Sequence, residues 1–98
     1  MKRYRVAKLR ELQPLVCPCG EARRAFTDVS GAPLSVHLVK ISKSARPHYH
    51  KKLTEVYIVL EGQGYLELDG ERVEVEPLSA VMIVPGCRHR ACGELLIL

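Results

Sequence analysis

Long apolar runs and aromatic residues are both scarce in this chain. Its 98 residues include no tryptophan and one phenylalanine, and no segment approaches the ~20 consecutive apolar residues that a membrane-spanning helix needs. The opening stretch, MKRYRVAKLRELQP, also lacks the apolar core of a secretory signal. We therefore expect a cytoplasmic protein that is not associated with a membrane.

A basic stripe with interleaved aromatic residues is missing as well. The net charge is +4, and aromatic residues make up only 5% of the chain. Lysine and arginine are scattered from the N-terminus to Arg90, whereas nucleic-acid-binding surfaces gather them on one face. Helical periodicity is limited to residues 6–12, so no helix-turn-helix is expected. These absences exclude nucleic acid as the expected partner.

The four cysteines do not form a recognisable framework. Cys17 and Cys19 flank one proline, and Cys87 and Cys92 lie far downstream. A disulfide across Cys-Pro-Cys would be strained, and the spacings are not those of paired zinc knuckles. We expect free thiols, with a four-thiolate zinc site as the alternative.

Turn residues divide the chain from Arg23 onward into short strands. Asp69-Gly70 is the strongest hairpin signal, and Glu-Gly-Gln-Gly at 61–64 reads as another turn. Strands are expected at 34–41, 55–60, 65–68, 72–76, 80–84 and 94–98. Roughly seven such strands in one small chain predict an all-β fold, a small antiparallel β-barrel or sandwich. We expect one domain over residues 1–98, with 1–22 as an N-terminal arm.

Two of these strands are apolar on both faces, namely VYIVL at 56–60 and AVMIV at 80–84. A strand of a small antiparallel barrel turns one face to the core and the other to solvent. A second subunit would cover the outer face, so we expect a homodimer. The alternative is that the segment 9–16 folds back over it.

Two histidines lie one residue apart, next to a carboxylate. His48 and His50 project to the same side if their segment is extended, and Glu55 begins an apolar strand a few residues later. A buried lone carboxylate is costly unless it is paired or bound to a metal. His89, which follows a Pro-Gly turn, supplies a further imidazole. This mixed nitrogen and oxygen set suits one divalent transition metal ion, although ordinary surface or hydrogen-bonded histidines remain the alternative.

The spacing of these residues matches a known pattern. His48-x-His50-x4-Glu55-x6-Gly62 resembles the first motif of the cupin family. The resemblance implies a jelly-roll barrel (a double-stranded β-helix) that is usually dimeric or larger and binds a metal inside the barrel. Carried over residue by residue, it implies His48, His50, Glu55 and His89 as the ligands.

A second pattern, Pro85-Gly86-x2-His89, resembles the core of the second cupin motif. Two departures concern its turn and not its ligand. Residues 79–80 are Ser-Ala where the family usually has Gly-Asp, and Val84 stands where proline is common. Together the two motifs make the resemblance cover most of the chain from residue 34 onward.

Four protein ligands leave two positions of an octahedral ion open to a substrate. The ligand set suits iron, manganese, nickel, copper, cobalt and zinc alike, so it does not name the metal. The resemblance implies a metal-dependent enzyme, either a dioxygenase-type oxidoreductase or an isomerase, although no catalytic residue is assigned. The alternatives are a non-catalytic small-molecule-binding or sensing domain, and a barrel that the metal only stabilises.

The remaining site expectations concern the surroundings of the ligands. Four residues could line a pocket, with core packing as the alternative for each: Tyr57, Val59, Met82 and Cys87. Four basic residues flank the ligands in the sequence and would favour a small anionic substrate, with an ordinary solvated rim as the alternative: Lys51, Lys52, Arg88 and Arg90.

Overall fold

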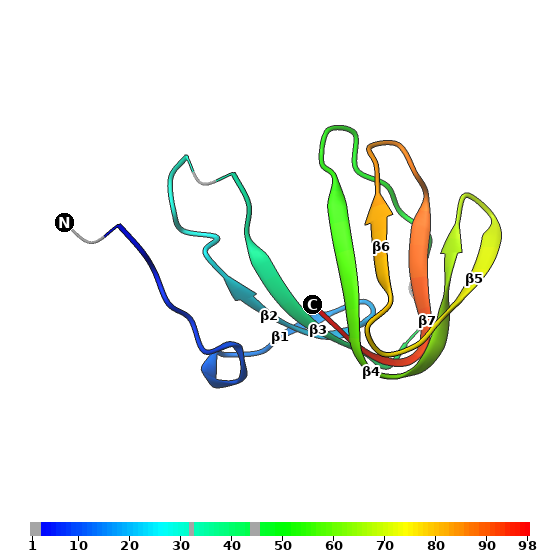
Figure 1. The fold of residues 1–98 in the computed structure, drawn as a ribbon, viewed down its shortest axis with the longest axis horizontal. Coiled ribbons are helices and arrows are strands. Elements are labelled where there is room, and N and C mark those ends of the chain that lie inside the picture. The colour runs from blue at the N-terminus through cyan, green and yellow to red at the C-terminus, as the bar shows by residue number, and fades with distance from the viewer. Residues whose placement is uncertain (1–2, 32, 44–45) are drawn as a thin grey trace.

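Seven antiparallel β-strands build the described part of the chain, and the prediction of an all-β barrel is confirmed (Figure 1). The structure is a computed structural model that describes residues 3–31, 33–43 and 46–98. A short 3-10 helix, η1 (Leu9–Glu11), precedes the strands. The strands are β1 (Leu15–Cys17), β2 (Gly20–Ala25), β3 (Val36–Ile41), β4 (Glu55–Leu68), β5 (Glu71–Val75), β6 (Ala80–Ile83) and β7 (His89–Ile97). No helix in the described ranges is long and apolar enough to cross a membrane.

The long strand β4 organises the sheet. The strand order is β1-β2-β3-β7-β4-β5, and β6 pairs with the first part of β4. The register of β4 against β7 shifts between Val59 and Glu61, which marks a β-bulge. Bulges bend and twist a strand, so β4 passes from its pairing with β6 to its pairing with β5 while the sheet curls, as Figure 1 shows. The start of β4 is therefore paired with β6, and its second half is paired with β5.

The expected turn at residues 61–64 is wrong, because β4 runs through it without a break. A Cβ atom on Gly62 would lie 2.0 Å from the Glu94 carbonyl oxygen, and one on Gly64 would lie 2.2 Å from that of Cys92. These glycines let the backbones of β4 and β7 approach each other. The last strand, β7, is also longer than the expected strand at 94–98, because it begins at His89. By contrast, Asp69 and Gly70 form the predicted hairpin turn between β4 and β5.

The hydrophobic core lies at the inner face of the curled sheet. Val59 and Leu66 are completely buried, and with them cluster Ile41, Val75, Ala91, Leu95 and Ile97. Along β4, Glu55, Tyr57 and Val59 project to one side, because residues two apart share a face of a strand. That row leads from the candidate ligands into the core, so the site lies at one end of the barrel interior.

The arm expected at residues 1–22 contains β1 and the start of β2, which belong to the sheet. The part before β1, residues 3–14, is called the arm below, and it lies along β2 and not over β4 and β6. The helix η1 contacts β2, and the Arg23 guanidinium donates a hydrogen bond of 3.1 Å to the Leu12 carbonyl oxygen. In Figure 1 the arm and β1 to β3 stand on one side of the molecule, and β6 stands on the other. Segment 9–16 therefore does not cover the outer apolar face of β4 and β6.

Candidate metal centre

The structure brings the four expected ligand residues together from three separate segments. One ligand atom from each of His48, His50, Glu55 and His89 lies within 4.8 Å of the others. Glu55 and His89 are the first residues of β4 and β7, and both histidines of the pair lie in the segment before β4. These four side chains form a cluster that could hold a metal ion.

Backbone hydrogen bonds fix the histidine segment against its neighbours. The His48 amide donates to the His89 carbonyl oxygen at 3.0 Å, and the His89 amide donates back to His48 at 2.8 Å. The Gly86 amide donates to the His50 carbonyl oxygen at 2.8 Å. The two cupin-like motifs are thus joined through their main chains, which holds the imidazoles in position without any metal.

The ring of His89 is oriented by a hydrogen bond of its own, in addition to the backbone bonds. Its Nδ1 lies 2.9 Å from the Cys87 carbonyl oxygen, and a carbonyl can only accept, so Nδ1 carries the proton. In the neutral ring, Nε2 then presents a lone pair to the cluster. Such an outer hydrogen bond is the usual support of a metal-binding histidine, and the side chain is only 1% exposed.

Glu55 lies between two of the histidines. Its Oε1 is 3.0 Å from Nε2 of His50, and its Oε2 is 3.0 Å from Nε2 of His89. Nevertheless, Glu55 Oε2 and His89 Nε2 are buried and make no hydrogen bond with acceptable geometry. Buried polar atoms nearly always have a partner. A cation between a carboxylate oxygen and a ring lone pair would satisfy both atoms, so these residues fit a metal ion.

His48 completes the cluster from its more exposed side. Burial and the neighbouring His89 lower the pKa of His48, and the Glu55 carboxylate only partly offsets them. The rings of His48 and His89 lie with centroids 4.2 Å apart. A lowered pKa keeps this imidazole neutral at neutral pH, which is the form that coordinates metals.

The expected pocket residues lie in different surroundings. Tyr57 is half-buried beside the cluster, where burial and the Glu55 carboxylate raise the pKa of its phenol, so it stays protonated. Val59 belongs to the buried core. Met82 lies opposite Val56 on the outer face, so it does not line the inner pocket as expected. The half-buried Cys87 thiol lies 3.7 Å from the Arg88 carbonyl oxygen.

One inward-facing residue was not assigned from the sequence. His37 shares its face of β3 with Val39 and Ile41, which pack into the core. Its Nε2 lies 2.9 Å from the Ser35 hydroxyl. Burial and Arg24 lower the pKa of His37, while Glu55 acts in the opposite direction. The alternation along 37–41 could have indicated this orientation.

The expected ring of basic residues is only partly present. Lys51, Lys52 and Arg88 are exposed in the segments that carry the ligands, and Arg88 lies 5.6 Å from the centre of the Tyr49 ring. Arg90 instead forms two hydrogen bonds, of 2.7 and 2.9 Å, with the Glu67 carboxylate. Arg90 is therefore engaged within the sheet, and the other three remain as the cationic side chains near the site.

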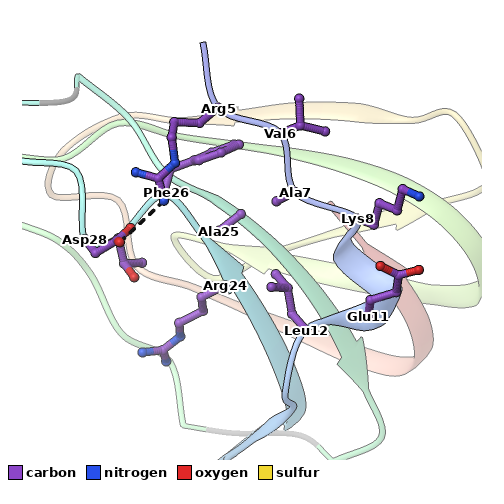
Figure 2. A pocket seen from close by; sticks show the side chains of 11 residues that line it. Arg5, Val6, Ala7, Lys8, Glu11, Leu12, Arg24, Ala25, Phe26 and Asp28 are labelled. Carbon is purple, nitrogen blue, oxygen red and sulfur yellow. Dashed lines mark hydrogen bonds and ion pairs between the residues drawn. The ribbon is translucent and has the colours of Figure 1, made fainter. Parts of the chain in front are cut away.

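Two surface hollows lie away from the ligand cluster. One, of about 540 Å³, separates the arm from the end of β2, where Arg5 pairs with Asp28 at 3.5 Å (Figure 2). The other, of about 600 Å³, lies beside η1 between charged residues of β2, β3 and β7. Neither is lined by a candidate ligand. Both hollows are open to solvent and are lined by charges of both signs. The candidate functional site is therefore identified by the chemistry of the buried ligand cluster and not by the size of a hollow.

Comparison with known proteins supports the assignment of the fold. A crystal structure of a protein from Planctomyces limnophilus is 40% identical, with a TM-score of 0.91, over 96% of this chain and 84% of that one. Pac13, a nucleoside dehydratase from Streptomyces, has a TM-score of 0.81 over 98% of this chain and 78% of its own, at 17% identity.

A sequence relative and a family model agree with these structures. The uncharacterized protein MJ1618 of Methanocaldococcus jannaschii is 32% identical over 57 residues, which are 58% of this chain and 46% of that protein. The chain thus matches about half the length of this relative. The cupin domain model matches residues 35–92, which include all four candidate ligands. The chain belongs to the cupin family.

Proposed function

We propose that the chain is a metal-dependent enzyme that moves protons on a small anionic molecule. Its four ligands would be His48, His50, Glu55 and His89, holding one divalent transition metal ion. The observation that carries the proposal is the buried pair of Glu55 Oε2 and His89 Nε2, which lie 3.0 Å apart without a hydrogen bond. When bound, the metal supplies Lewis acidity toward a substrate oxygen.

Two protic side chains favour proton transfer over a purely structural role for the metal. Tyr57 keeps its phenolic proton next to Glu55, so it can donate a hydrogen bond to a substrate oxygen. His37 faces the same interior and is neutral at neutral pH, so it can accept a proton. An isomerase or a lyase needs such an acid and base. The similarity in fold to a nucleoside dehydratase is compatible with this class.

The charge around the site supports an anionic substrate. Lys51, Lys52 and Arg88 are exposed in the same segments as the ligands, and clustered cations raise the local concentration of anions. The histidine pair forms the accessible side of the cluster, since His48 is exposed and His89 is buried. We infer that a carboxylate or phosphate compound approaches from that side.

The proposal is tested with protein loaded separately with each candidate metal. Mixtures of small keto acids, hydroxy acids and sugar phosphates in deuterated water are followed by NMR for exchange at carbon, with oxygen uptake recorded in parallel. We expect metal-dependent exchange that is lost in His50→Gln and weakened in His37→Gln. Oxygen uptake without exchange would contradict proton transfer and indicate a dioxygenase-type oxidoreductase. Tight ligand binding without turnover would contradict catalysis and indicate a sensing domain.

We also propose a homodimer formed through the outer face of β4 and β6. Val56, Met82 and Val84 are 51%, 69% and 56% exposed, and Val56 lies directly opposite Met82 in the pairing of the strands. Neighbouring apolar side chains left in water cost roughly 25 cal/mol per Å² of uncovered surface. A second copy presenting the same face would remove this cost. The free thiols fit a cytoplasmic location, which we propose as well.

A further inference from the structure

Cys17 and Cys19 place their sulfur atoms 2.9 Å apart at the β1–β2 hairpin. Cys17 is the last residue of β1 and pairs with Gly20, so Pro18 and Cys19 form the two-residue connection. Both side chains are half-buried. A disulfide needs a sulfur separation of about 2.0 Å, so the two atoms are already close to bonding distance.

The hairpin is held firmly around this pair. The Cys19 carbonyl oxygen accepts hydrogen bonds from the amides of Ser42, at 2.8 Å, and Lys43, at 3.1 Å. At Gly20, whose φ is 145°, an added Cβ would lie 2.1 Å from the Lys40 carbonyl oxygen, so the turn is packed tightly against β3. The short separation of the sulfurs is therefore built into the fold.

The two thiols have different surroundings, which assigns them different roles. Cys19 packs against the core cluster that Tyr57 also contacts. Burial and the adjacent Cys17 raise the pKa of Cys19 to about 11, so it remains protonated at neutral pH. A protonated, core-facing thiol is the poorer first nucleophile, and it is well placed to attack a neighbouring oxidised sulfur.

We propose that Cys17 and Cys19 are a redox-active dithiol that reacts with small peroxides and closes a reversible disulfide. The Cys17 thiolate attacks one peroxide oxygen, the O–O bond breaks, and a sulfenic acid forms with release of water. Cys19 then attacks the Cys17 sulfur, the S–S bond forms, the S–O bond breaks, and a second water leaves with the Cys19 proton. Two thiols lose two electrons and two protons, and one hydrogen peroxide becomes two waters.

The disulfide is expected to be easily reduced. A bridge between residues two apart departs from relaxed disulfide geometry, and strained disulfides are the labile ones. A cellular thiol such as glutathione would restore the dithiol by exchange. This site is separate from the candidate ligands and does not depend on the proposed metal chemistry.

The test treats the full chain with hydrogen peroxide and maps its cysteines by intact mass and peptide analysis. We expect the loss of two hydrogens per chain, a link between Cys17 and Cys19, and full recovery with glutathione. Cys19→Ser should stop at a sulfenic acid on Cys17 that a dimedone probe traps, whereas Cys17→Ser should give neither product. Cys87→Ser is the matched control and should react like the unchanged protein.

Several results would overturn the proposal. These are oxygen addition without a disulfide in the unchanged protein, a bridge that involves Cys87 or Cys92, and a bridge between two chains. A Cys17–Cys19 disulfide that resists glutathione would overturn its reversibility. Circular dichroism of both serine variants establishes that each is folded before its chemistry is compared.

Discussion

The Tyr57 phenol and the Glu55 carboxylate project from the same face of β4, and the carboxylate lies close enough to raise the pKa of the phenol. The phenol keeps its proton because burial and the adjacent carboxylate both raise its pKa. While no substrate is bound, the phenol can therefore donate a hydrogen bond to Glu55, and Glu55 Oε2 stays directed toward His89. Outer hydrogen bonds of this kind orient metal ligands.

Tyr57→Phe should weaken metal binding while leaving the ligands in place. Loss of an outer-shell partner typically costs about 10–100-fold in metal affinity, and we expect a loss near the lower end because Glu55 also contacts His50. Competition with a chelator measures the change. Tyr65→Phe is the control, since its ring lies under Arg72 at 3.8 Å and away from the ligands. Equal affinities of the two variants would contradict this role for Tyr57.

Gly64→Ala should destabilise the barrel. The added Cβ would lie 2.2 Å from the Cys92 carbonyl oxygen, so β4 and β7 would have to separate, at a cost of about 1–3 kcal/mol in the free energy of unfolding. Urea denaturation measures it. Gly70→Asn is the control, because nothing lies within 4 Å of its Cβ position and asparagine tolerates a positive φ. A loss no greater than the control's would refute the close approach of the two strands.

The glycines of β4 show where sequence reasoning fails. A glycine-rich turn and a close contact between two strands can have the same local sequence. Only the position of β7 beside β4 distinguishes the two structures. At Gly70 a Cβ atom would meet nothing within 4 Å, so no close backbone contact competes with the local turn signal of Asp69-Gly70. The difference lies in whether local chemistry or a long-range contact determines the backbone.

The same distinction applies to the site. His48, His50 and Glu55 were predictable because their spacing is short and their types are unusual together. The alternation along residues 37–41 indicates the inward direction of His37, but the contact between Cys19 and the core depends on how β1 to β3 fold against β4, which no local pattern records. The parity of residues 80–84 does not show which face is inner, and only the pairing of Met82 with the exposed Val56 puts Met82 on the outer face.

Val56→Lys combined with Met82→Lys should convert the proposed dimer to monomers. The two side chains are paired across β4 and β6, and lysine on both copies would put like charges into an apolar interface. Sedimentation at micromolar concentration measures the change. Val16→Lys with Leu34→Lys is the matched control, since these residues are 88% and 64% exposed and lie outside that face. Dissociation of the control alone would place the interface on the arm side, against the proposal.

Acidification should destabilise the metal-free protein. The pKa values of His37 and His48 are lowered in the folded state, so the unfolded chain binds more protons as the pH falls through its histidine pKa of about 6.5. The free energy of unfolding should therefore decrease from pH 7.5 to 5.5. Urea denaturation with a chelator present measures it. The double variant His37→Gln, His48→Gln should show a shallower dependence, and an equally steep one would rule out these histidines as its source.

Metal titration of the chelator-treated protein, followed by calorimetry and elemental analysis at pH 7.5, tests the central claim most directly. The ligand cluster predicts one divalent ion per chain, and a loss of affinity of more than about 100-fold in Glu55→Gln and His50→Gln. His37→Gln, which changes a histidine outside the cluster, should bind the ion like the unchanged protein. Binding of one ion with unchanged affinity in both ligand variants, or no binding of any candidate metal by the unchanged protein, would contradict the assignment.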